Sequence, residues 1–337
     1  MKPKGDRVIE TLVNIVLLIF LVITAIAIVR MRDLFAVVMM SGIFGLLSAS
    51  FFVAMDAVDV AFTEASVGAG IATLLMLTAV TLTGRSEDSK RHRPMWALVV
   101  VFITGGLLIY GTLDMPYFGS SQAPVHLHVA QRYINDSMQE TGMPNIVTSV
   151  LASYRGFDTL GEVVVIFTAG MGVLALLRVE RRPGIDQTMA DTIFYLMHER
   201  HLILRIVTKM LLPFILLFAL YVQFHGDFGP GGGFQAGVIF AAAIILYAMV
   251  FGLHTARRVV NRTFVRLLSA IGVLLYGGVG VVSMLYGGNF LDYNVLASDP
   301  VAGQHLGILL IELGVGCTVA AVMVIIFFNF SGRRNSP

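Results

Sequence analysis

The sequence predicts an all-α fold, a polytopic transmembrane helical bundle of about nine spans arranged as five plus four. Two observations predict this class. Of the 337 residues, 57% are hydrophobic and only 13% are charged, with a mean hydropathy of +0.83, whereas a soluble domain has about 25% charged residues. The charges are also clustered between long apolar stretches. Such a chain cannot cover a water-facing surface, so we expect an integral membrane protein.

Nine apolar stretches are long enough to cross a bilayer, since a span needs roughly 20 apolar residues. They lie at residues 9–29, 34–55, 59–83, 95–113, 158–178, 202–222, 233–253, 264–285 and 304–329. The first stretch follows Lys2, Lys4 and Arg7 and could alternatively be a signal peptide, but it is long for one and more spans follow.

Two polar segments divide the spans into domains. Residues 114–157 are predicted to form a long outer loop, and residues 179–200 a polar inner linker. We therefore expect three regions, at residues 1–90, 91–182 and 183–337, with the best boundary at the inner linker, which has five spans before it and four after it.

Lys and Arg residues in short loops predict the orientation, because they are enriched on the cytoplasmic side. With nine spans, five basic sets fall on one side. These are Arg30 and Arg32; Arg85, Lys90, Arg91 and Arg93; Arg178, Arg181, Arg182, Arg200 and Arg205; Arg257, Arg258, Arg262 and Arg266; and Arg333 and Arg334. That side, with the C-terminus, is predicted to be cytoplasmic. The basic N-terminal tail is the one conflict.

The composition also excludes several classes of site. The single cysteine, Cys317, lies in an apolar stretch, which excludes a disulfide framework, a Cys-ligated iron–sulfur cluster and a zinc site. The net charge of +2 is too small to indicate a nucleic-acid partner. We expect no cofactor, no metal and no enzymatic activity.

Ionisable residues inside the membrane are functional candidates, because a charge in hydrocarbon is costly. Four are predicted to lie there: Glu64, Glu162, Lys209 and Glu312. Glu64 lies near Asp59 and Thr63, which are also ion-translocation candidates. The glycines at positions 68 and 70 allow a local distortion of its helix. A carboxylate beside a deformable helix suits proton or Na⁺ handling. The alternative for Glu64, as for Glu312 and Lys209, is a structural pair with a neighbouring helix.

The acids also share a predicted level in the membrane. Asp158 is expected to cap the fifth span, where acids are favoured, whereas Glu162, one turn further in, is harder to explain as a cap. Glu64, Glu162 and Glu312 all fall in the first part of spans that run from outside to inside. We expect them in the outer half of the membrane, and our hypothesis is that they approach one cation path.

A glycine-rich segment, His225 to Gly237, joins the sixth and seventh spans. Its centre reads His225, Gly226, Asp227, Phe228, Gly229, Pro230, Gly231, Gly232 and Gly233, and it lacks the Lys and Ser/Thr of a nucleotide-binding loop. Such a backbone can enter the membrane only where protein or water satisfies its polar groups. His225 could titrate, although a tight turn with His225 as a wedge is the favoured interpretation. Small-residue clusters at 277–280 and 303–316 predict close helix packing.

Three segments of the sequence resemble those of a known family. The His225–Gly237 segment resembles the signature of MrpB (MnhB) in the Mrp (Mnh) multisubunit Na⁺/H⁺ antiporters. Residues 56–70, preceded by Asp33, look like the MbhD-type region in the C-terminal part of MrpA. Asn145, Ile146 and Val147, followed by residues 154–162, resemble the MbhE-type segment that comes next there. The matches occur in family order and cover nearly the whole chain.

The resemblance implies a non-enzymatic, multi-pass subunit of the plasma (inner) membrane. Its complex would exchange internal Na⁺, or another monovalent cation, for external H⁺. Its partners would be the other Mrp-type subunits: the antiporter-like MrpA and MrpD, and MrpC, MrpE, MrpF and MrpG. The MbhD-like region implies an ion-carrying interface, with Glu64 and Glu162 carried over best. Two alternatives stay open. One is the ion-translocating module of a redox-driven pump of the membrane-bound hydrogenase type, and the other is a structural scaffold subunit.

Overall fold

The structure, a computed structural model, describes residues 4–87, 95–117, 119–177 and 202–333. Within these ranges it contains nine helical segments long and apolar enough to span a membrane, and no strand beyond an isolated bridge between Asp33 and Ser86. The predicted fold class and number of spans are confirmed. The predicted inner linker, residues 179–200, lies outside the described residues.

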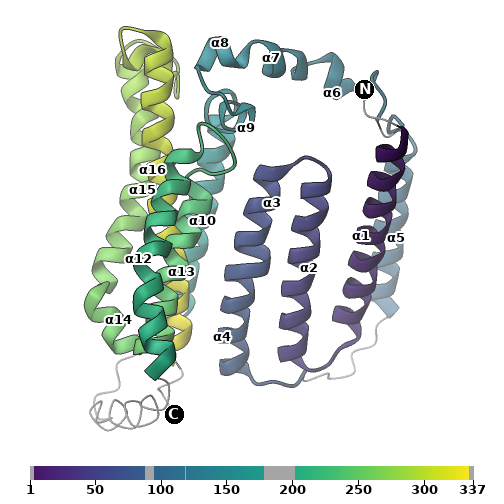
Figure 1. Cartoon of the computed structure of the whole chain (residues 1–337), viewed down its shortest axis with the longest axis vertical. Coiled ribbons are helices and arrows are strands. Elements are labelled where there is room, and N and C mark those ends of the chain that lie inside the picture. The colour runs from purple at the N-terminus through teal and green to yellow at the C-terminus, as the bar shows by residue number, and fades with distance from the viewer. Residues whose placement is uncertain (1–3, 88–94, 118, 178–201, 334–337) are drawn as a thin grey trace.

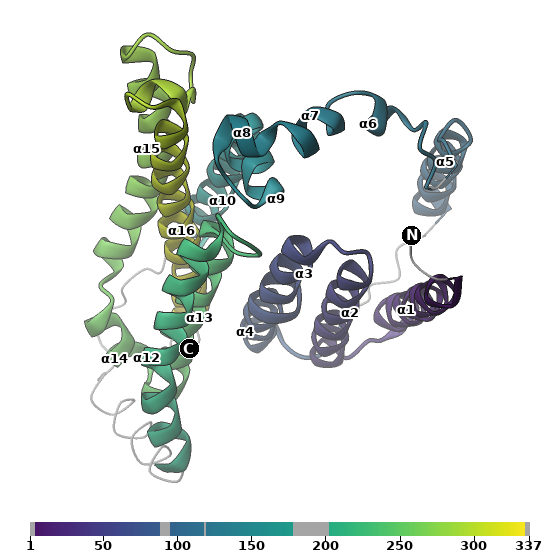
Figure 2. The ribbon, with the colours of Figure 1, turned by 45° about the horizontal axis from the view of Figure 1, so that its top comes forward.

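The N-terminal spans form a row at one side of the molecule (Figures 1 and 2). Helix α1 (Lys4–Arg30) packs on α2 (Leu34–Ala54). The third span is continuous but changes its winding: α3 (Val58–Glu64) passes into a π-helix, η1 (Ala65–Ala72), and then into α4 (Thr73–Thr83). This third span is the member of the row that reaches the C-terminal bundle, through contacts with α13 and α16.

The predicted outer loop is mostly helical. After α5 (Met95–Thr112), four short helices follow in an arc that crosses from α5 to the C-terminal bundle (Figure 2). They are α6 (Pro124–Leu127), α7 (Ala130–Asn135), α8 (Ser137–Thr141) and α9 (Ile146–Thr148). A second π-helix, η2 (Ser149–Tyr154), leads into the fifth span, α10 (Gly156–Leu176).

The C-terminal bundle holds most of the buried core. It comprises α12 (Leu202–His225), α13 (Gly233–Phe251), α14 (Leu253–Val259), α15 (Arg262–Leu285), the 3₁₀ helix η4 (Tyr293–Leu296) and α16 (Pro300–Arg333). Helix α16 is central and contacts α10, α13 and α15.

Glycines let the helices of the bundle approach closely, as predicted for residues 303–316. A methyl group built on Gly237 would lie 2.7 Å from the Gly316 carbonyl oxygen, and one on Gly314 would lie 2.7 Å from the Gly272 carbonyl oxygen. Gly277 and Gly278 differ, because a methyl group on either would meet nothing within 4 Å. The first predicted cluster therefore makes a close contact only at Gly280, which lies against Phe290.

Candidate functional site

Glu64 lies at the point where the third span leaves α-helical winding. The distortion expected near Gly68 and Gly70 is the π-helix η1, which begins directly after Glu64. The half-buried Glu64 side chain lies against α2, since a methyl group on Gly45 would be 3.3 Å from its Oε1. π-Helical turns frequently occur at functional sites. Glu64 therefore sits between α2 and the distorted turn.

The neighbouring Thr63 faces the C-terminal bundle. The buried amide of Gln235, in the first turn of α13, donates from Nε2 to Thr63 Oγ1 at 2.8 Å. The same hydroxyl donates to the Asp59 carbonyl oxygen at 3.0 Å. Thr63 thus connects the third span to the helix that follows the glycine-rich segment.

Asn145 holds three parts of the chain together. Its Nδ2 lies 3.3 Å from Asp59 Oδ1, 3.2 Å from the Gly226 carbonyl oxygen and 3.1 Å from the Gly229 carbonyl oxygen. Its backbone N–H donates to the Asp227 carbonyl oxygen at 3.1 Å. One side chain thereby fixes the third span and the glycine-rich loop to the start of α9.

The glycine-rich loop brings its backbone against Glu312 of α16. Gly232 has a φ of +112°, and a methyl group there would lie 3.0 Å from Glu312 Oε1. A methyl group on Gly231 would lie 2.7 Å from the Val222 carbonyl oxygen, and one on Gly233 would meet the Glu312 carbonyl oxygen. These glycines, together with Pro230, form a tight turn that leaves room for a carboxylate.

Asp227 and Glu312 are close enough to interact electrostatically. Burial raises the pKa of Asp227, which lies in the loop outside the spans, and the charge of His305 opposes that rise. No Lys or Arg within the described ranges forms an ion pair with either carboxylate. Two neighbouring acids that no Lys or Arg of the described residues neutralises favour a bound proton or a mobile cation.

We call the set Asp59, Thr63, Asn145, Asp227, Gln235 and Glu312 the polar junction. Three of its members, Asp59, Thr63 and Glu312, are sequence-predicted ion-translocation candidates, and Asp227 is a predicted member of the structural loop. Sequence reasoning missed Asn145 and Gln235 as site residues. Asn145 was named only as part of the MbhE-type motif. Its cap position before α9, where its Oδ1 accepts from Val147 N at 3.0 Å, is a further local signal that could have drawn attention to it.

The His225 ring packs as a wedge in the turn of the glycine-rich segment. Its ring stacks on Tyr221, with centroids 4.9 Å apart and planes 17° apart. A methyl group on Gly229 would lie 3.0 Å from its Nε2. The ring thus fills the turn that Gly229 leaves open.

Two of the predicted intramembrane ionisable residues, Glu162 and Lys209, lie away from the polar junction. Glu162 is exposed on α10 and interacts electrostatically with Tyr276 of α15. Glu312 instead faces α13, whereas α15 packs on the side of α16 that carries Gly314. The structure therefore does not bring Glu162 together with Glu312.

Lys209 is also exposed, and its ammonium lies 5.6 Å from the centroid of the Phe251 ring. Phe251 is at the far end of α13 from Gly233. With a rise of 1.5 Å per residue, these two ends are about 27 Å apart. Lys209 is therefore remote from the carboxylates of the polar junction.

The expectation that Asp158 caps the fifth span is wrong. The capping position of α10 is Arg155, and no side chain donates or accepts a capping bond there. Asp158 lies in the first turn and pairs with Arg155 at 2.6 Å. An acid in this turn still interacts favourably with the helix dipole, and α10 begins two residues earlier than predicted.

Three family models match successive parts of the chain. Residues 203–325 match the domain related to the MnhB subunit of Na⁺/H⁺ antiporters. Residues 19–85 match the MbhD component of MBH, and residues 99–192 match its MbhE component. The putative antiporter subunit mnhB2 of Staphylococcus aureus (strain Newman) is 36% identical over 142 residues, which cover 41% of this chain and 100% of the relative. The chain belongs to the MnhB family.

Two solved structures share the fold of this MnhB family member. One is the Mrp complex from Dietzia sp. DQ12-45-1b, with a TM-score of 0.73 and 25% identity over 95% of this chain and 35% of that chain. The chain thus covers about a third of its counterpart there. The other is the membrane-bound sulfane sulfur reductase (MBS), an archaeal respiratory membrane complex, with a TM-score of 0.53 and 28% identity over 70% of this chain and 97% of that chain.

The three matched segments meet at the polar junction. Asp59 and Thr63 come from the MbhD-matching segment, Asn145 from the MbhE-matching segment, and Gln235 and Glu312 from the MnhB-related segment. The direct hydrogen bonds of Asn145 and Gln235 cross these segment boundaries. All three matched segments therefore contact one another at the junction.

Proposed function

We propose that this chain is a membrane subunit of a multisubunit Na⁺/H⁺ antiporter and that the polar junction is part of its cation and proton path. One observation carries the proposal: acids that form no ion pair with a Lys or Arg of the described residues meet neutral oxygen atoms where the three family-matched segments join. The chain's membership of the MnhB family supports Na⁺/H⁺ exchange as the kind of transport. Its partners in this proposal are the other Mrp-type subunits, MrpA, MrpC, MrpD, MrpE, MrpF and MrpG.

The chemistry of exchange follows from the cost of charge in a membrane. A buried carboxylate is stable there when a proton or a cation neutralises it. Glu312 and Asp227 interact electrostatically, so we expect a proton and a Na⁺ to compete for them. Asp59 Oδ1 and the main-chain oxygen of Gly229 are oxygen ligands of the kind that hard cations prefer. Alternating occupancy of the acids would couple the export of Na⁺ to the import of H⁺.

Glu64 is proposed as a second acid on the side of α2. Its position next to the π-helix suits a switch of winding that would change its exposure, because a π-helical turn can return to α-helical winding with a shift of one residue. Glu162 and Lys209 are not part of the proposed junction. Glu162 remains a proposed ion-handling residue on the exposed face of α10, where another subunit could contact it.

The test is transport by the whole complex reconstituted in vesicles, with Na⁺-driven pH change as the readout. Glu312→Gln and Asp59→Asn should each lower the exchange rate by at least about tenfold, as expected for the loss of a positioned proton-transfer group. Asp114→Asn is the matched control, since it removes the same charge at an exposed position outside the junction. Normal exchange in both junction variants, with the complex assembled, would instead support a scaffold role.

The likeness to the archaeal respiratory complex supports a second candidate function, the ion-translocating module of a redox-driven pump. The proteins that copurify with the native complex distinguish the two. Iron–sulfur subunits in stoichiometric amounts would favour the redox pump, and antiporter-like subunits without them would favour the exchanger.

We also propose the organisation of the chain. Its functional regions are residues 1–90, 91–182 and 183–337, and the C-terminus is cytoplasmic. The basic sets that flank the spans support this orientation.

A further inference from the structure

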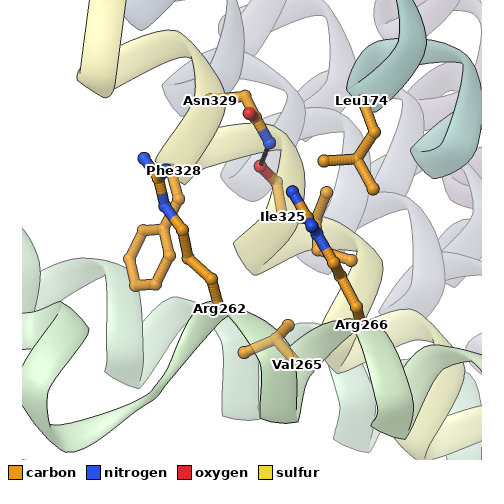
Figure 3. A pocket seen from close by; sticks show the side chains of 7 residues that line it. All are labelled: Leu174, Arg262, Val265, Arg266, Ile325, Phe328 and Asn329. Atoms are coloured by element: carbon orange, nitrogen blue, oxygen red, sulfur yellow. Dashed lines mark hydrogen bonds between the residues drawn. The ribbon is translucent and has the colours of Figure 1, made fainter. Parts of the chain in front are cut away.

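An arginine-rich pocket lies far from the polar junction, at the other end of α16. Figure 3 shows the side chains that line it. Arg262 and Arg266 extend from the start of α15 toward the last turns of α16. Leu174 of α10, Val265 and Ile325 supply apolar walls. Ile325 follows Glu312 by 13 residues on one helix, or about 20 Å, so the pocket is separate from the proposed ion path.

A third arginine adjoins this pocket. Arg257 donates from Nη2 to the Phe328 carbonyl oxygen at 2.8 Å, while its buried Nε has no hydrogen-bond partner. A methyl group on Gly332 would lie 2.5 Å from Arg257 Nη2 and 3.4 Å from Arg262 Nη2, so the two guanidinium groups are near one another. Burial, together with the charge of Arg262, lowers the pKa of Arg257 to about 10.

Arg257 and Arg266 form no ion pair with an acid in the parts of the chain that the structure describes. The ion pairs there involve Arg85, Arg132 and Arg155 instead. The N-terminus of α15, capped by Asn261, adds its partial positive charge to the same place. The guanidinium groups and the helix N-terminus together favour an anion.

The apolar residues that line the pocket, and its depth in the membrane, indicate which kind of anion it binds. Arg262 begins one span and the apolar run of α16 ends near Gly332, so the pocket lies at the level of the membrane surface. The aliphatic walls beside the arginines would suit an acyl chain, and free phosphate would leave them uncovered. We propose that this pocket binds the phosphate headgroup of an anionic phospholipid, as basic pockets between transmembrane helices do elsewhere. The proposal is independent of the transported ion.

The test measures lipid retention by the purified full-length chain. The protein is stripped of lipid in mild detergent and then titrated with phosphatidylglycerol or with phosphatidylcholine, and bound lipid is counted by native mass spectrometry. Arg266→Gln should weaken phosphatidylglycerol binding about fivefold, and Arg262→Gln with Arg266→Gln about 25-fold. Arg258→Gln is the matched control, since this exposed arginine lies at the same end and does not line the pocket.

A second variant keeps every charge. Leu174→Trp narrows the apolar side of the pocket and should also reduce phosphatidylglycerol binding, which tests the site even if an arginine variant folds poorly. Equal retention of phosphatidylcholine would overturn the proposal in favour of lipid binding without selectivity for headgroup charge. An equal loss in Arg258→Gln would overturn it in favour of diffuse surface charge. Displacement of the lipid by millimolar inorganic phosphate would overturn it in favour of a free-anion site.

Discussion

At the scale of single residues, Asp227 is a carboxylic acid placed where its charge is costly. Burial raises its pKa, so the folded protein binds this proton more tightly than the unfolded chain does. Its contribution to stability is present at low pH and is lost as pH rises through the raised pKa. We expect Asp227→Asn, which mimics the protonated acid, to melt at a higher temperature than the natural protein at pH 8.

The advantage of Asp227→Asn should shrink as the pH is lowered toward 4, because the natural residue then becomes protonated. Thermal melting of the purified protein across this range checks the prediction. If instead Asp227→Asn melts below the natural protein and this difference in melting temperature grows with pH, the fold stabilises the charged form of Asp227.

Gly232 is a residue at which backbone conformation and available space both require glycine. Its φ of +112° lies in a region that other residues adopt only with strain of about 1–3 kcal/mol, and Glu312 occupies the space of a side chain. Gly232→Ala should therefore lower the free energy of unfolding by at least that amount. Gly277→Ala, in an open helical position, should be neutral or stabilising by about 0.5–1 kcal/mol. Similar losses in both variants would contradict this account.

At the scale of secondary-structure elements, Asn145 begins α9 and also joins that helix to two other segments. Asn145→Ala should lose the cap, which is worth about 1 kcal/mol, and should also release Asp59 and the glycine-rich loop. We expect a marked loss of Na⁺/H⁺ exchange by the reconstituted complex.

Asn261 provides the control for Asn145. Its side chain caps α15 by accepting from Thr263 N at 3.0 Å, the same distance at which Asn145 caps α9. Asn261→Ala should cost similar stability while leaving exchange close to normal. Equal loss of exchange in both variants would mean that capping alone, and not the junction, explains the effect.

At the scale of the whole molecule, the two sides of the membrane should be distinguishable by thiol labelling. In a Cys317→Ser background, Ser121→Cys in the outer segment should react with a membrane-impermeant maleimide on intact cells. Val259→Cys, at the end of α14, should react only after permeabilisation. The opposite pattern would reverse the proposed orientation and place the arginine pocket at the outer surface.

The exposure of the N-terminal spans is relevant to how the chain assembles with other membrane subunits. None of the residues in the α5 span is buried within the chain, and only 6% of those in α1 are. By contrast, half of the apolar stretch of α13 is buried. Helices this exposed and apolar need lipid or other membrane subunits around them, which agrees with the proposal that the chain works inside a larger complex.

The sequence by itself determined the fold class and the spans. Hydropathy over about 20 residues is a local property, set by the thickness of the bilayer, so the predicted stretch 59–83 corresponds to Val58–Thr83 and the predicted 304–329 to Pro300–Gly332. The distortion after Glu64 was also predictable, because Gly68 and Gly70 are close to it in the chain. The second π-helix, η2, carries no comparable glycine signal and was not predicted.

Only the tertiary structure decided which polar residues meet. Asn145 bonds to groups 86 and 81 positions away, and such contacts depend on how the helices pack and rotate against one another. The same rotation places Glu312 toward α13 and leaves Glu162 exposed on α10. Sequence position predicts the depth of an acid in the membrane, because depth follows from residue number along a helix. It does not predict the neighbours of that acid, because packing between helices chooses which face of each helix is covered.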